Sequence, residues 1–164
     1  MNAAELMAAL NTVEQDHRLV LDKVQALKEA VSCLLEPSIT DMRCTLRRFW
    51  EINEFLSTQF TSHMEEEETS LFPFLEQYTP EGRDLVGRLR LEHEEIRRMR
   101  EEFGNCLHVA SELEPDLPKA VLRDLLADGW ALWEIMDNHA HAETQGVRQC
   151  IARQLGEETP AGSG

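Results

Sequence analysis

The chain has 164 residues and a mass of 18.8 kDa, the size of one domain, and its 42% hydrophobic and 29% charged residues can form a buried core. A net charge of −15 and a pI near 4.7 disfavour binding to nucleic acid and to anionic membranes, because phosphate groups would be repelled. No apolar run approaches the roughly 20 residues of a membrane span, and residues 1–6 lack the basic stretch and apolar core of a secretory signal. The four cysteines lie far apart without a CxxC pair, which favours buried, reduced thiols at Cys33, Cys44, Cys106 and Cys150. We therefore expect a cytoplasmic protein with no nucleic-acid or membrane partner.

Three clusters of helix-breaking residues divide the chain into four long segments, and these clusters lie at 36–38, 78–82 and 114–118. In each segment, residues of one face recur at steps of three and four, which is typical of helices packed nearly antiparallel. The four stripes cover 10–34, 42–67, 86–107 and 122–150. Alternating Val, Ile and Thr runs are absent, so no sheet is expected. We predict an all-α, antiparallel up-down-up-down four-helix bundle over residues 1–155, followed by a flexible tail over 156–164.

Each stripe contains one histidine, and two of the stripes also carry a glutamate four residues after that histidine. The six residues are His17, His63, Glu67, His93, His139 and Glu143. His17 and His63 are 46 residues apart, and so are His93 and His139. The chain therefore resembles two α-hairpins offset by 76 residues. Residues four apart share a helix face, and antiparallel packing can bring all four histidines to one level. Polar groups on inward faces are costly unless something satisfies them, so this level is the candidate functional site.

The residue types at this level favour two metal ions. Four imidazoles and two carboxylates are too many for one zinc ion, which takes four ligands. Two ions could each take two imidazole nitrogens and one oxygen from each of two bridging carboxylates. Mixed nitrogen and oxygen donors suit iron, manganese or zinc. A solvent-derived oxo or hydroxo bridge would complete a five-coordinate set and leave one position open for a small ligand.

Four short motifs in chain order resemble the hemerythrin-like (HHE cation-binding) family. They are Asp16-His17, His63-Met64-Glu65-Glu66-Glu67 with Leu71-Phe72-Pro73 after it, Glu92-His93-Glu94-Glu95-Ile96, and His139-Ala140-His141-Ala142-Glu143. The resemblance spans all four predicted helices, about residues 10–152. It implies a non-haem di-iron centre in which the four histidines are terminal ligands and Glu67 and Glu143 are bridges.

Two departures from the oxygen-carrying hemerythrins point to a different role. Those carriers have a second histidine four residues after the one in the third helix, where this chain has Arg97. They also place the carboxylate of the last helix five residues after its histidine, whereas Glu143 follows His139 by four. A set of four histidines and two glutamates is similar to the di-iron domain of the iron–sulfur-cluster repair proteins. The resemblance therefore implies binding or sensing of nitric oxide, oxygen or peroxide, in a stress response or in iron repair.

Several other polar residues near the predicted ligands are expected to lie outside the ligand set. His141 should face solvent, and His108 lies too far along its helix to reach the same ions. Asp16 and Glu92 are either outer partners of imidazole N–H groups or surface charge. A solvated face is expected for Glu65, Glu66 and Glu68, with Glu66 as one candidate for an extra oxygen donor, and Arg97 either is a surface residue or covers the open metal position.

The sequence leaves three alternative functions to consider. Ferritin-like di-iron oxidases use Glu-x-x-His pairs, and only Glu14 with His17 forms one on these stripes. A nitric oxide or peroxide reductase would use the same centre but would need an electron donor. A structural or storage bundle filled with zinc or manganese would need no redox chemistry.

Overall fold

The computed structural model describes residues 3–34, 42–78, 80–114 and 116–154, and every regular element within them is helical. The first hairpin begins with α1 (Ala3–Leu34). Its second arm is a continuous rod in five parts: α2 (Met42–Phe55), η1 (Leu56–Phe60), α3 (Thr61–Glu66), η2 (Glu67–Leu71) and α4 (Phe72–Tyr78). The second hairpin consists of α5 (Pro80–Leu113) and α6 (Lys119–Gln154).

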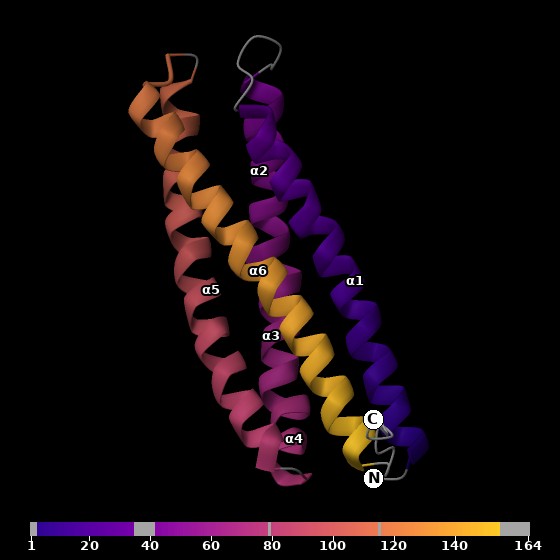
Figure 1. Ribbon diagram of the computed structural model, residues 1–164. Coiled ribbons are helices and arrows are strands. Elements are labelled where there is room, and N and C mark those ends of the chain that lie inside the picture. Colours follow the sequence, from indigo (N-terminus) through magenta and orange to yellow (C-terminus); the bar gives the residue numbers. More distant parts are fainter. Residues whose placement is uncertain (1–2, 35–41, 79, 115, 155–164) are drawn as a thin grey trace, which may run out of the picture.

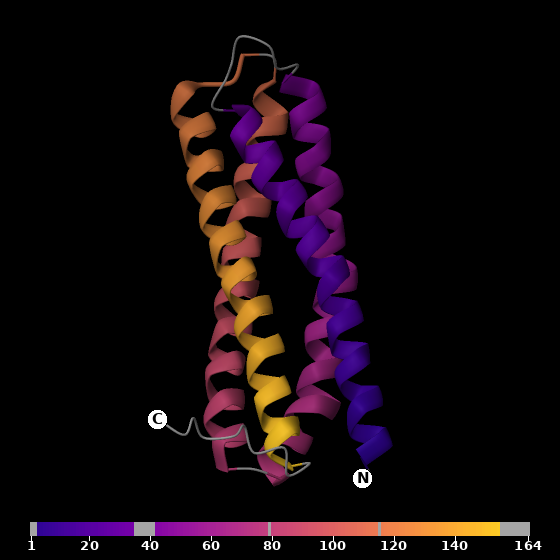
Figure 2. The same cartoon turned by 45° about the vertical axis from the view of Figure 1, so that its right-hand side comes forward.

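The rods run side by side and alternate in direction (Figure 1). The beginning of α1 and the end of α6 lie at the same end of the molecule, and a view turned by 45° shows the same arrangement (Figure 2). Helix α6 packs against both α5 and α1, while α2 packs against α1 and α5. The predicted antiparallel up-down-up-down bundle is therefore confirmed.

Helices end and begin at the predicted breaks 78–82 and 114–118. α5 begins at Pro80, where a fixed φ and a missing N–H suit the first turn, and the break at 114–118 separates α5 from α6. The break at 36–38 and the predicted tail at 156–164 lie outside the described residues. Among the helices that are described, none has both the length and the apolar character to cross a membrane.

The apolar core consists of two clusters that are separated by one level of polar side chains. The larger cluster includes Val24, Phe49 and Phe103, and the smaller one includes Phe72 and Val147. Along α5 the smaller cluster ends at Leu89 and the larger begins at Ile96, and along α6 they are separated between Met136 and Val147. The candidate site lies in these intervals, so apolar packing seals it at both ends.

The cysteines only partly follow the sequence expectation. Cys150 is buried in the smaller apolar cluster, while Cys33 and Cys106 are half-buried. Cys44 is exposed, so the prediction of a buried thiol is wrong there. A position near the beginning of α2, on the face turned away from the neighbouring helices, leaves this residue in contact with solvent.

Two π-helical segments interrupt the second rod, one just before His63 and the other beginning at Glu67. Each contains a pair of hydroxyl residues whose side chains hydrogen-bond to carbonyl groups four residues earlier, as Thr58 does to Glu54 at 2.7 Å and Thr69 does to Glu65 at 2.8 Å. Such bonds compete with the backbone ladder and disturb a regular helix. π-turns are rare and occur often at functional sites. Each extra residue in a turn changes which face the following residues occupy.

Two glycines allow close approach of neighbouring helices to α6. A Cβ atom on Gly129 would lie 2.9 Å from Val31 Cγ2 of α1 and 3.2 Å from Phe103 Cε2 of α5. A Cβ atom on Gly146 would lie 2.6 Å from Leu85 Cδ1. Side chains of α1 and α5 occupy the space that a larger residue at either position would need. The absence of a side chain at these glycines therefore lets α1 and α5 pack close to α6.

Candidate metal centre

The six residues predicted as ligands come from all four rods and converge on the polar level between the two apolar clusters. His17 lies on α1, His93 on α5, and His139 and Glu143 on α6. His63 and Glu67 face the same level from α3 and the start of η2. Five of the six are buried, and the side chain of His63 is 13% exposed.

One half of the site is formed by His93 and His139 with both carboxylates. The Nε2 atoms of the two rings lie 3.2 Å apart. Glu67 Oε2 lies 3.4 Å from His93 Nε2, and Glu143 Oε2 lies 3.3 Å from His139 Nε2. One ligand atom from each of these four residues falls within 4.8 Å of all the others. Two nitrogens bound to one ion at about 2.1 Å each can be this close, so the group has the dimensions of a single metal position.

The other half is formed by His17 and His63 around the opposite side of the same carboxylates. Glu67 Oε1 lies 2.8 Å from His63 Nε2 and 3.4 Å from His17 Nε2. Glu143 Oε2 lies 3.1 Å from His17 Nε2. Glu67 therefore directs one oxygen to each histidine pair, and a single oxygen of Glu143 lies beside both pairs. This is the arrangement that two carboxylates need in order to bridge two ions.

Unsatisfied oxygens at this level show that the donor set fits metal ions. Glu67 Oε2 and both oxygens of Glu143 are buried and accept no hydrogen bond. Glu143 is fully buried. A buried carboxylate oxygen without a hydrogen bond is unfavourable, and coordination to a cation would satisfy it. Imidazole nitrogen with carboxylate oxygen is a set that iron, manganese and zinc accept.

The histidines and carboxylates of the site also shift one another's pKa values, in the directions that favour their charged forms. Burial by itself favours the neutral forms, but Glu143 and Glu67 outweigh it and raise the pKa of His17 to about 9. Burial is likewise outweighed at His139, where Glu143 and Glu92 raise the pKa to about 9. The nearby imidazoles overcome burial and lower the pKa values of Glu67 and Glu143. Both carboxylates are therefore ionised, as metal ligands must be.

A family comparison agrees with this geometry, because residues 8–149 match the family model described as the hemerythrin HHE cation binding domain. The chain belongs to this hemerythrin family. No curated protein and no solved structure has a significant match to it. The family match and the buried His/Glu cluster together establish a hemerythrin-like domain with a metal-binding arrangement of side chains.

Outer hydrogen bonds orient three of the four imidazoles in this hemerythrin-like site. His93 Nδ1 donates to Glu68 Oε1 at 2.8 Å, and His139 Nδ1 donates to Glu92 Oε2 at 2.8 Å. His17 Nδ1 lies 2.7 Å from the Thr144 hydroxyl. Because an ionised carboxylate can only accept, His93 and His139 carry a proton on Nδ1, and when each ring is otherwise neutral its Nε2 is free to bind a metal ion.

Glu68 was expected on a solvated face, and the structure corrects this. Arg97 Nη2 donates to the same Glu68 oxygen at 2.7 Å, so the carboxylate is held between Arg97 and His93. Although partial burial opposes it, these two hydrogen bonds lower the pKa of Glu68. Arg97 is thus engaged with Glu68 rather than placed among the ligand atoms. Glu68 lies in the widened turn of η2 and contacts His93 and Arg97 of α5, which a regular helical periodicity does not predict.

The remaining sequence expectations have mixed outcomes. Glu92 contacts an imidazole as one of its two interpretations predicted, whereas the side chain of Asp16 lies outside the described residues. The His141 and His108 side chains are 66% and 65% exposed and stand apart from the cluster. Thr144 was not anticipated, although its place directly after a predicted ligand, like that of Glu68, was a signal available in the sequence.

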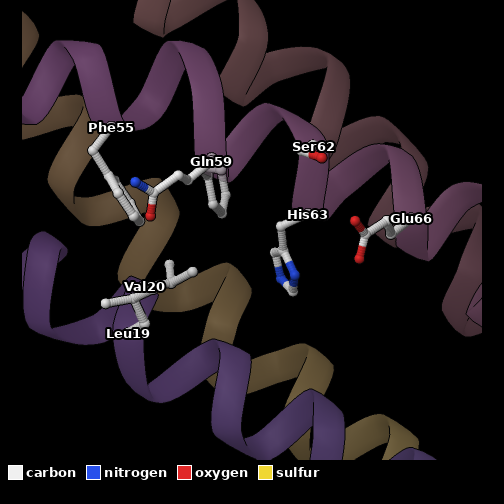
Figure 3. Close-up of a pocket in the computed structure, with 8 residues that line it drawn as sticks. Leu19, Val20, Phe55, Gln59, Ser62, His63 and Glu66 are labelled. Atoms are coloured by element: carbon white, nitrogen blue, oxygen red, sulfur yellow. The ribbon is translucent and has the colours of Figure 1, made fainter.

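A pocket of about 280 Å³ opens beside His63 between α3 and α1. Figure 3 shows the imidazole of His63 pointing from α3 into this space. Apolar side chains of Leu19, Val20 and Phe60 line it, and Gln59 and Glu66 add polar groups. Glu66 itself is exposed and is not among the grouped ligand atoms. The pocket therefore lies on the His17/His63 side of the site.

Proposed function

We propose that this hemerythrin-like protein holds two iron ions joined by an oxo or hydroxo bridge. His17 and His63 would be terminal ligands of one ion, His93 and His139 those of the other, and Glu67 and Glu143 would bridge them. The single observation that carries this proposal is that each carboxylate lies within 3.4 Å of a nitrogen from both histidine pairs. Manganese or zinc can be held by the same donors, so metal identity is the first quantity to measure.

We infer that the centre binds a diatomic ligand or peroxide, or changes redox state, in oxygen or nitric oxide sensing, in a stress response or in iron repair. Bound iron supplies one-electron redox steps and a coordination position that small ligands can occupy. The protein supplies two carboxylates that balance part of the metal charge and a largely apolar pocket that admits small uncharged molecules. The engagement of Arg97 with Glu68 supports a ligand set of four histidines, in contrast to the oxygen carriers that the sequence resembles less closely.

The test begins with metal analysis of protein expressed in iron-rich medium. We expect about two irons per chain and near-ultraviolet absorption from oxo-to-iron charge transfer, as the two ligand groups imply. Zinc or manganese in place of iron would favour the structural or storage function. The reduced protein is then titrated anaerobically with nitric oxide, oxygen and peroxide.

The titration separates the remaining functions. A stable oxygen adduct would indicate oxygen carriage and contradict the proposed role in sensing, stress response or iron repair. Rapid oxidation by oxygen or peroxide, or formation of a nitrosyl spectrum, supports sensing or stress response. Sustained consumption of nitric oxide or peroxide with an added electron donor would instead identify a reductase.

A further inference from the structure

The outer hydrogen bonds of the site follow the internal repeat of the chain. An offset of 76 residues relates His17 to His93 and Glu68 to Thr144. The structure pairs these residues crosswise, since His93 Nδ1 contacts Glu68 at 2.8 Å and His17 Nδ1 contacts Thr144 at 2.7 Å. The same contact is therefore made twice, once with a carboxylate and once with a neutral hydroxyl.

Both rings of the His93/His139 pair have a carboxylate as their outer partner. The second ring of this pair donates to another carboxylate, Glu92, at 2.8 Å. Glu68 is also fixed by Arg97, so it cannot easily turn away from His93. By the repeat, the counterpart of Glu92 is Asp16, whose side chain lies outside the described residues. The inference therefore depends on the substitution of threonine for glutamate at the outer side of His17.

A carboxylate acceptor makes a histidine a stronger metal ligand than a hydroxyl acceptor does. It draws the Nδ1 proton, increases the electron density at Nε2 and adds negative charge near the cation. Loss of such a partner typically lowers metal affinity by about 10–100-fold. On this ground alone, an ion between His93 and His139 would be bound more tightly than an ion between His17 and His63.

Solvent access differs in the same sense. The side chain of His63 is 13% exposed and lines the pocket of about 280 Å³. A second pocket, of about 310 Å³, reaches His139, but that side chain is 3% exposed and its Nδ1 is covered by Glu92. Water and competing ligands therefore reach the His17/His63 position more readily.

We propose that the two metal positions are inequivalent, with a retained ion between His93 and His139 and an exchangeable ion between His17 and His63. Glu68 acts as a positioning residue for the retained ion. This inference rests on the proposed two-metal function.

The test measures release of Fe(II) from the anaerobically loaded protein to an excess of a colour-forming Fe(II) chelator. Wild-type protein should lose its two ions in two phases of equal amplitude. Glu68→Gln should accelerate the slow phase by about 10–100-fold and leave the fast phase unchanged. Thr144→Glu, which restores the repeat, should slow the fast phase. Gln145→Glu, which adds the same charge at an exposed neighbouring position, serves as the matched control with wild-type rates.

The outcomes separate the inference from the function on which it rests. Release of both ions in a single phase, or equal acceleration of both phases by Glu68→Gln, would overturn the inequivalence while two bound ions still supported the function. A stoichiometry below two in the wild type would refute the two-metal function before release is measured. Circular dichroism shows whether each variant is folded. If Glu68→Gln does not fold, the release rates of Thr144→Glu decide whether the two positions are inequivalent.

Discussion

The metal-free protein should lose stability as the pH rises from about 6.5 to 9. The pKa values of His17 and His139 are raised from 6.5 to about 9 in the folded state, so folding favours their protonated forms. Their contribution is complete below the unfolded pKa near 6.5 and is lost as the pH passes the folded pKa near 9. For one histidine the change corresponds to about 3 kcal/mol.

The expected change is large enough to measure by thermal unfolding. In a chain of this size, 1 kcal/mol shifts Tm by about 2–4 °C, so one histidine accounts for about 6–12 °C. The two contributions do not simply add, because both histidines contact Glu143. Circular dichroism with a chelator present, at several pH values between 6 and 9.5, gives Tm directly. Metal-loaded protein is the control, since its ligand histidines are already neutral and its Tm should be nearly constant over this range.

Glu143→Gln tests the cause of the effect. Glu143 contributes to the raised pKa of both histidines, so the neutral amide should flatten the dependence of Tm on pH. Imidazole resonances followed by NMR give the two pKa values independently of stability. A Tm of the metal-free protein that stays level or rises between pH 6.5 and 9 would refute the reasoning, as would imidazole pKa values near 6.5.

Three further predictions concern the ligands, the helix contacts and the pocket. His93→Ala or Glu143→Ala should lower bound iron from two ions per chain to one or none, with helicity retained. The exposed control His141→Ala should bind as much iron as the wild type does, and full iron in the Glu143 variant would show that this residue is not a bridge. Gly87→Ala should raise the free energy of unfolding by about 1 kcal/mol, because nothing lies within 4 Å of the new Cβ atom. Gly129→Ala should lower the free energy of unfolding by about 1 kcal/mol, because its Cβ atom would press on Val31. Equal effects of the two variants in denaturant titrations would contradict the close packing of α6 against α1. Gln59→Trp should fill the pocket beside His63 and slow nitric oxide binding to the reduced protein in stopped-flow mixing without changing iron content, and an unchanged rate would mean that ligands enter elsewhere.

The sequence by itself determined the helices and the inward position of the six polar residues. Both follow from local periodicity: a residue three or four places from a buried neighbour lies on the same helix face. His139 and Glu143 could be placed together in this way without any tertiary information. The short connections between long helices then made an antiparallel bundle the expected packing, and antiparallel rods bring residues at matching heights to one level.

Only the tertiary structure decided which groups surround those six residues. The π-turns rotate the second rod, so Met64 is fully buried while His63 is partly exposed, and Glu68 reaches His93 on another helix. Periodicity counts residues along one helix and carries no information about the rotation and stagger of its neighbours. The pairing of His93 with Glu68, and of His17 with Thr144, depends on that rotation and stagger, and so became visible only when the four rods were packed together.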